Sequence, residues 1–101
     1  MLPEIVTPLA MMLIAWPVLA AVTLVRFQIT AITSTSITLE WETASEFNNL
    51  GFFVTRSSSE GGEYVAISDF IPAEGSAVSG SIYQFVDSNL ISGQYYYYKL
   101  Q

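Results

Sequence analysis

The chain contains no cysteine and no histidine among its 101 residues. The absence of cysteine excludes a disulfide framework and thiolate chemistry, and the absence of histidine removes the commonest general base and metal ligand. Basic residues are also scarce, with three Lys or Arg against nine Asp or Glu and a formal net charge of −6. Nucleic acid requires a basic footprint, so we expect no nucleic-acid partner.

Motifs that support catalysis are absent as well. Lys99 is the sole lysine, and no G-x-S-x-G or S-x-x-K motif accompanies it. Glu40 and Glu42 alternate onto the expected solvent face of a strand, which argues against a carboxylate pair for glycoside hydrolysis. Side-chain oxygens gather around one corner, at Glu42, Ser45, Glu46 and Asn48, without the D-x-D-x-D-G spacing of a calcium loop. We predict a protein that is not an enzyme and that uses no metal or cofactor.

Charge divides the chain into two parts. No charged residue occurs between Ile5 and Val25, whereas residues 26–101 carry eight of the nine acids and all three bases. We therefore predict an apolar N-terminal segment over residues 1–21 and a β domain over residues 22–101.

Three interpretations of residues 1–21 stay open. A signal peptide fits the small residues around a cut at Ala20–Ala21, although Glu4 stands where a basic region is expected. A retained membrane anchor fits the 21 uncharged residues from Ile5 to Val25, which Arg26 follows. The third interpretation is that Met1 is not the biological start. Either of the first two predicts a secreted or cell-surface protein that meets the membrane only through this segment.

From Val22 onward, apolar and polar residues alternate in the manner of β-strands. In the first expected strand, Val25, Phe27 and Ile29 share one face. The expected strands cover residues 22–30, 36–42, 51–57, 63–71, 81–86 and 94–101, with turns rich in Gly, Ser and Asn between them. This pattern predicts an all-β antiparallel sandwich.

The corner between the second and third strands is the most informative stretch. Trp41 shares its face with Ile37 and Leu39, a polar turn follows over residues 45–51, and Phe52 and Val54 restart the alternation. We expect Trp41 to face an aromatic side chain of the next strand inside the core.

The line ITLEWETASEFNNLGFFVTRS resembles the fibronectin-type-III-like modules found near the C-terminal ends of large secreted bacterial surface proteins. In those modules W-x-T-A-S-E-x-N-N-x-G-F-x-V-x-R-S marks the second and third strands. Further blocks occur in order, at Ile71-Pro-Ala, Tyr83-x-Phe-x-Asp87 and Ser92-Gly-x-Tyr-Tyr-Tyr-Tyr-Lys-Leu100, so that the resemblance covers residues 22–101. It implies an immunoglobulin-like or fibronectin-III-like sandwich that serves as a spacer, an adhesive unit or a carrier of secretion signals.

The resemblance also implies one more strand after Gln101, and hence an open edge on the strand over residues 94–101. We expect that the chain is a C-terminally truncated fragment. A partner, or the apolar segment of the chain itself, is the alternative occupant of that edge.

Five residues form the predicted structural core: Trp41, Phe52, Val54, Leu90 and Tyr96. Leu90 precedes Tyr96 by six residues, the spacing of a tyrosine corner in sandwiches of this type. The predicted ligand or partner surface consists of Tyr95, Tyr97 and Phe53, with Tyr83 as a further aromatic candidate.

We predict a non-catalytic structural or adhesive module of an exported bacterial surface protein. Its expected partners are neighbouring domains of the same polypeptide and cell-surface glycans or proteins. Two alternatives remain: a carbohydrate-binding module that uses the exposed aromatic residues, and a membrane-anchored subunit of a surface filament.

Overall fold

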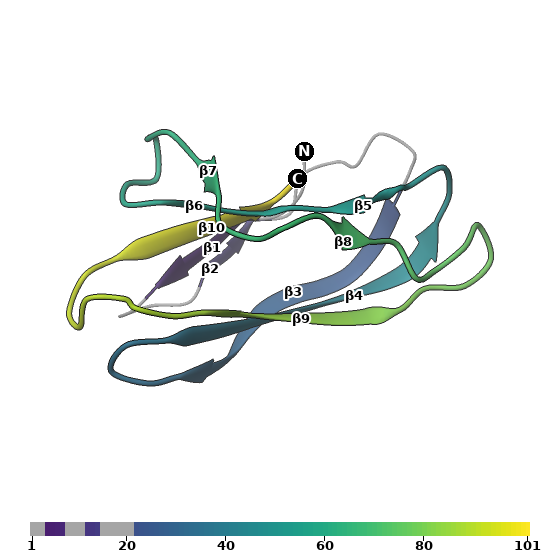
Figure 1. Ribbon diagram of the computed structural model, residues 1–101. Helices are drawn as coiled ribbons and strands as arrows, with labels where there is room; N and C mark the ends of the chain where they lie inside the picture. The colour runs from purple at the N-terminus through teal and green to yellow at the C-terminus, as the bar shows by residue number, and fades with distance from the viewer. Residues whose placement is uncertain (1–3, 8–11, 15–21) are drawn as a thin grey trace.

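The computed structural model describes residues 4–7, 12–14 and 22–101, and these residues form ten strands and no helix (Figure 1). One sheet has five strands in the order β2 (Met12–Ile14), β1 (Glu4–Thr7), β10 (Tyr96–Leu100), β6 (Val54–Ser57) and β7 (Val65–Ala66). A second has β3 (Val22–Ile32), β4 (Ile37–Glu46) and β9 (Ile82–Asp87), and β5 (Gly51–Phe52) pairs with β8 (Ile71–Pro72). All pairings are antiparallel. The predicted all-β antiparallel sandwich is confirmed, while its assignment to the immunoglobulin or fibronectin-III class stays a prediction.

The core lies between the five-stranded and three-stranded sheets, which form the two layers visible in Figure 1. Trp41 is completely buried at its centre. Its ring packs edge-on to Phe27 at 6.3 Å and to Phe52 at 5.7 Å, and stacks on Tyr83 at 5.4 Å between centroids. The contact with Phe52 confirms that Trp41 faces an aromatic side chain of the next strand.

The first strand departs from simple alternation. Val25 was expected to share one face with Phe27 and Ile29, but it is 55% exposed, whereas Phe27 is fully buried. The pairing of β3 with β4 shifts register between Leu24 and Arg26 and leaves Val25 unpaired. Such a bulge reverses the phase of the side chains, and the prediction that Val25 shares a face with Phe27 is therefore wrong.

The predicted strand over residues 63–71 is also wrong, because only β7 and β8 form there. The Ile67 N–H donates to the Val54 carbonyl at 2.9 Å. The next bond comes from the Val54 N–H to the Ser68 hydroxyl, also at 2.9 Å. This side-chain oxygen replaces a backbone carbonyl and ends the ladder, since Ser competes locally for backbone partners.

The remaining strands agree with the sequence except at their ends. Residues 51–57 change partners at Phe53, which exchanges two backbone hydrogen bonds with Gln101, at 2.8 and 2.9 Å. The second strand runs four residues beyond the expected Glu42, to Glu46. Backbone bonds from Thr43 to Ser81 and from Glu46 to Ser76 extend it.

The N-terminal strand β1 pairs along β10, with Glu4 opposite Lys99 and Val6 opposite Tyr97. The chain therefore supplies a strand to the edge that the sequence analysis leaves open. The division at residues 21 and 22 stays a prediction, because most of residues 1–21 lie outside the described residues. Within the described ranges, no helix is long and apolar enough to cross a membrane.

Candidate functional site

Glu46 forms the first of two buried carboxylate clusters. Its side chain accepts hydrogen bonds from the Tyr83 hydroxyl at 2.7 Å and from the Thr43 hydroxyl at 2.5 Å. The Tyr83 oxygen in turn accepts the Glu74 N–H at 2.8 Å. Burial, together with the bond to Glu46, raises the pKa of Tyr83 to about 12. The partners of the Glu46 carboxylate are thus side chains, from Thr43 on its own strand and from Tyr83 on β9.

Tyr83 belongs to this cluster and not to the surface. It is only 5% exposed, and its ring stacks on Trp41. Its proposed place among the surface aromatics is therefore wrong. Because Tyr83 lies on β9 and Glu46 ends β4, their bond fixes the corner over residues 45–51 against the neighbouring strand.

Asp87 forms the second cluster and ties the two sheets together. Both of its carboxylate oxygens accept from Arg56 Nη1 at 2.8 Å, and one also accepts from the Tyr98 hydroxyl at 2.8 Å. Asp87 belongs to the three-stranded sheet, whereas Arg56 and Tyr98 belong to the five-stranded sheet. Burial and the bond to Asp87 raise the pKa of Tyr98 far above its ordinary value. Asp87 is 6% exposed, so this is a nearly buried link across the core.

The Asp87 cluster was not predicted from the sequence, although the positions of Asp87 and Arg56 on their strands indicate it. Asp87 continues the inward phase of Tyr83 and Phe85, and Arg56 continues the inward phase of Val54. An acid and a base at inward positions predict a pair, because buried charges need partners.

The two buried carboxylates lie far apart. Asp87 pairs with Ile37 at the start of β4, and Glu46 lies nine residues further along that strand. At about 3.3 Å per residue, the separation is about 30 Å. Paired carboxylates in glycosidases lie roughly 5–10 Å apart. Glu46 and Asp87 therefore cannot form such a pair with each other.

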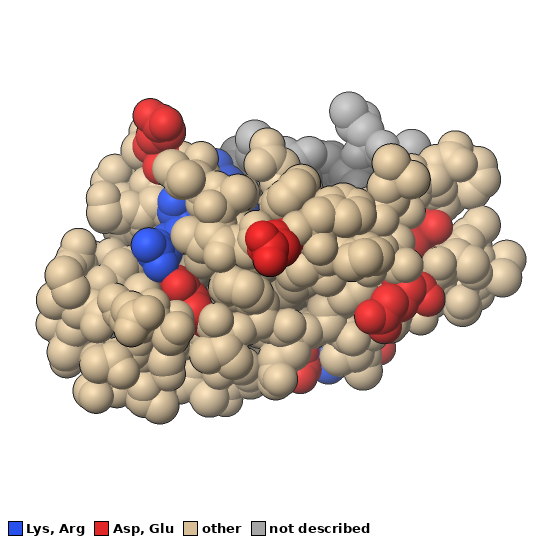
Figure 2. Space-filling view, in the orientation of Figure 1, with Lys and Arg blue, Asp and Glu red and all other residues tan. Residues whose placement is uncertain are grey.

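The residues considered for calcium also diverge. Glu42 and Glu40 bind Arg26 on the outer face of the three-stranded sheet, the Glu40 contact at 2.7 Å, whereas Glu46 points into the core. Among the described residues, no three acidic side chains converge as metal ligands would. Figure 2 shows the acidic side chains in separate places on the face in view.

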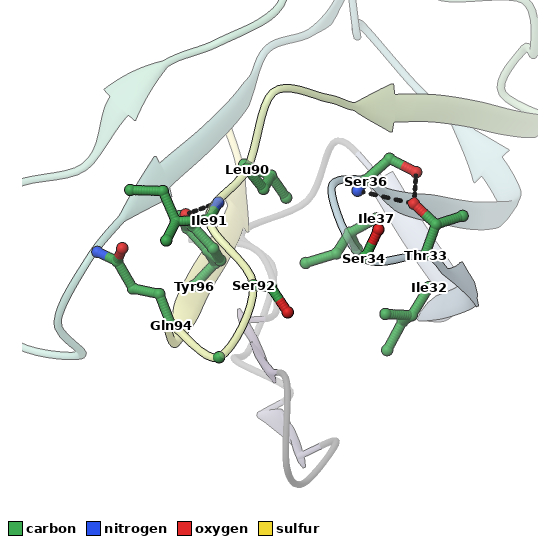
Figure 3. Close-up of a pocket in the computed structure, with 11 residues that line it drawn as sticks. Ile32, Thr33, Ser34, Ser36, Ile37, Leu90, Ile91, Ser92, Gln94 and Tyr96 are labelled. Atoms are coloured by element: carbon green, nitrogen blue, oxygen red, sulfur yellow. Dashed lines mark hydrogen bonds between the residues drawn. The ribbon is translucent and has the colours of Figure 1, made fainter.

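A small pocket lies between the turn at Thr33 and the loop before β10 (Figure 3). The Tyr96 hydroxyl accepts the Ile91 N–H there at 2.8 Å, and the Leu90 N–H donates to the Thr35 carbonyl at 2.9 Å. The pocket measures about 120 Å³ and has no charged residue in its lining. Ligand pockets usually measure about 300–1,000 Å³, so this one is better explained as the space beside a tyrosine corner.

The predicted surface residues lie on the outer side of the five-stranded sheet without forming one platform. Tyr97 stands opposite Ser57, and the Phe53 backbone bonds Gln101, which follows β10 and lies four residues after Tyr97. At the rise of an extended strand, Tyr97 and Phe53 are about 13 Å apart. Tyr95 precedes β10 and is 43% exposed.

Two aromatic residues that the sequence analysis missed extend this surface. Phe70 packs edge-on to Phe53 at 5.5 Å, and the Tyr64 ring lies 4.3 Å from Lys99 Nζ. Their aromatic character was readable, but their position depends on loops that carry no alternation. We call Tyr97, Lys99, Tyr64, Phe53 and Phe70 the outer aromatic strip. The predicted core residues, in contrast, are all buried: Trp41, Phe52, Val54, Leu90 and Tyr96.

Comparison with known proteins adds one similarity. No family model and no solved structure matches the chain. The chain is 34% identical over 70 residues to an amylopullulanase of Thermoanaerobacter thermohydrosulfuricus. The match covers 68% of this chain and 4% of that protein. The chain thus spans a small fraction of the length of the curated relative that it matches.

Proposed function

We propose that the chain is a non-catalytic β-sandwich module of a larger exported bacterial protein, in which it acts as a spacer or an interaction unit. The observation that carries the proposal is the similarity to 4% of a much longer amylopullulanase. A stretch of that size is typical of an accessory module beside larger units.

The interior supports the same proposal. Glu46 and Asp87, the acids that are buried among the residues whose burial the structure describes, are each hydrogen-bonded by hydroxyl or guanidinium groups that hold structural elements together. Each carboxylate therefore has a structural role, and neither lines the pocket beside Tyr96.

The test is an activity assay combined with unfolding of matched variants. We expect the protein to release no reducing sugar from starch or pullulan. Glu46→Gln should lower the urea midpoint, whereas exposed Glu63→Gln should leave it unchanged. Sugar release that Glu46→Gln abolishes while circular dichroism stays the same would overturn the proposal.

A second candidate is carbohydrate binding, which the outer aromatic strip favours. Phe53 and Phe70 are 37% and 46% exposed despite their size, and aromatic faces at a surface offer contact area at low entropic cost. The name amylopullulanase points to amylose and pullulan as substrates of that relative, which makes α-glucans the first ligands to test.

Affinity electrophoresis in gels containing starch or pullulan separates the two roles. A binding module would be retarded, and Phe53→Ala or Tyr97→Ala would reduce the retardation. Ile82→Ala and Val86→Ala are matched controls, because both side chains are more than half exposed on the other sheet. If the protein is not retarded, binding to these polysaccharides is excluded and the spacer role remains as the proposed function.

A further inference from the structure

Strand β10 has a partner on each side. Its pairing with β6 runs from Tyr97 opposite Ser57 to Leu100 opposite Val54. On its other side, β1 pairs from Glu4 opposite Lys99 to Thr7 opposite Tyr96. The second ladder covers backbone groups of β10 that would otherwise form a sheet edge.

This second ladder differs from the first in its connection to the fold. β6 is held to the rest of the fold by Val54, which belongs to the core cluster, and by Arg56, which binds Asp87 of the other sheet. β1 is a four-residue strand, as β6 is, but it precedes the described core cluster, which begins at Val22. Short strands held by few ladder bonds open at lower free energy than core strands. The side of β10 that β1 covers is therefore a site in the five-stranded sheet where the strand pair β1 and β2 can leave and another strand can enter.

A second copy of the chain carries the strand that fits this edge. Its residues 4–7 are identical to those already in place, so pairing between copies would reproduce the same register, with an acid opposite Lys99 and Val6 opposite Tyr97. Exchange of an identical element changes no contact within the ladder, which makes it a low-cost route to dimers.

We propose that the side of β10 covered by β1 is a strand-acceptor site that takes β1 from a second copy of this chain. In dilute solution β1 of the same chain occupies the site. At high local concentration, as on a surface, β1 of a neighbouring copy replaces it and links the two molecules by an antiparallel ladder.

The absence of native cysteine makes the test direct. Directly opposed residues of an antiparallel pair have Cα atoms about 4.5–5.5 Å apart, which lies inside the about 4.4–6.8 Å range of disulfides. The full chain with Val6→Cys is mixed at high concentration with an isotope-labelled chain with Tyr97→Cys and then oxidised. Mass spectrometry identifies disulfides between labelled and unlabelled chains. The matched control mixes Val6→Cys with Lys99→Cys, two positions out of register, where diagonal neighbours lie about 7–8 Å apart.

We expect the mixed disulfide to exceed the off-register control several-fold. The double variant Val6→Cys/Tyr97→Cys, oxidised when dilute, should close within one chain and lose the concentration-dependent dimer in size-exclusion chromatography until it is reduced. Three results would overturn the proposal: no mixed disulfide above the control, a dimer that persists in the closed double variant, or a double variant that does not close within one chain.

Discussion

At the scale of single residues, Trp41 contacts three aromatic rings from three different strands. Trp41→Ala would remove these contacts and leave a cavity, at a cost of about 3–5 kcal/mol. Small domains have a free energy of unfolding of about 5–15 kcal/mol, so we expect a strongly lowered urea midpoint. Tyr95→Ala, at an exposed aromatic, is the control and should change the free energy by less than about 0.5 kcal/mol. A stable Trp41→Ala protein would show that the core repacks around the gap.

Asp87 offers a second residue-scale prediction. Asp87→Asn keeps the shape of the side chain but removes the negative charge that Arg56 and Tyr98 share. Leaving buried polar groups poorly matched costs about 1–3 kcal/mol, and we expect a loss of stability in that range. Denaturant titration beside exposed Glu63→Gln measures it. Equal midpoints for the two variants would mean that the link between the sheets adds nothing to stability.

Residue identity predicted the hydrophobic core better than the buried polar groups. Trp41, Phe52 and Val54 were readable because strict alternation fixes the inward face of a strand. Tyr83 was misread as a surface residue because its hydrogen-bond partner Glu46 lies on a strand far away in sequence, and alternation says nothing about which polar groups meet.

At the scale of elements, the ends and interruptions of the strands were not predicted from the sequence. The bulge at Val25 and the ladder ended by Ser68 both depend on hydrogen bonds to another strand. Turn chemistry was more local: Asn48, in the polar turn over residues 45–51, takes a positive φ of 55°, which Asn tolerates better than most residues. Tyr97 and Phe53 of the outer aromatic strip were predicted, because both alternate outward. Tyr64 and Phe70 were not predicted, because they lie outside regular strands.

Removal of residues 1–21 is the element-scale prediction. The core cluster runs from Val22 to Leu100, so we expect the shortened protein to keep its β-sheet circular dichroism. Its β10 edge would lose the ladder to β1, and we expect a lower melting temperature and stronger self-association.

Thermal melts and light scattering at matched concentrations of the two forms provide the measurement. A shortened protein that melts at the same temperature and scatters no more light than the full chain would contradict a stabilising role of β1.

At the scale of the whole molecule, buried tyrosine hydroxyls set the response to alkali. In the folded protein the pKa of Tyr83 is about 12, against 10.0 as its ordinary value. The pKa of Tyr98 is raised as well. Between pH 10.0 and about pH 12, Tyr83 is protonated in the folded state but largely ionised in the unfolded state, so the folded state binds more protons. The free energy of unfolding therefore falls as pH rises from about 10 to about 12, and the full contribution is present below pH 10.

Urea midpoints measured from about pH 8 to about pH 11.5 test this dependence. Tyr83→Phe should be less stable at neutral pH, because Glu46 loses a donor, and should show a shallower alkaline decline. An unchanged alkaline slope in Tyr83→Phe would assign the decline to other groups.

The antiparallel register of β1 and β10 also determines how the module would respond to tension. Because Glu4 lies opposite Lys99, a pull applied through the two ends of the chain meets both strands at the same end of their ladder. The load then falls on one hydrogen bond at a time and unzips the pair, whereas a shear geometry would load all the bonds together. Stretching should detach β1 at low force while the Trp41 core stays intact. Detachment of β1 would expose the backbone groups of β10 that it covers, while the rest of the module stays folded.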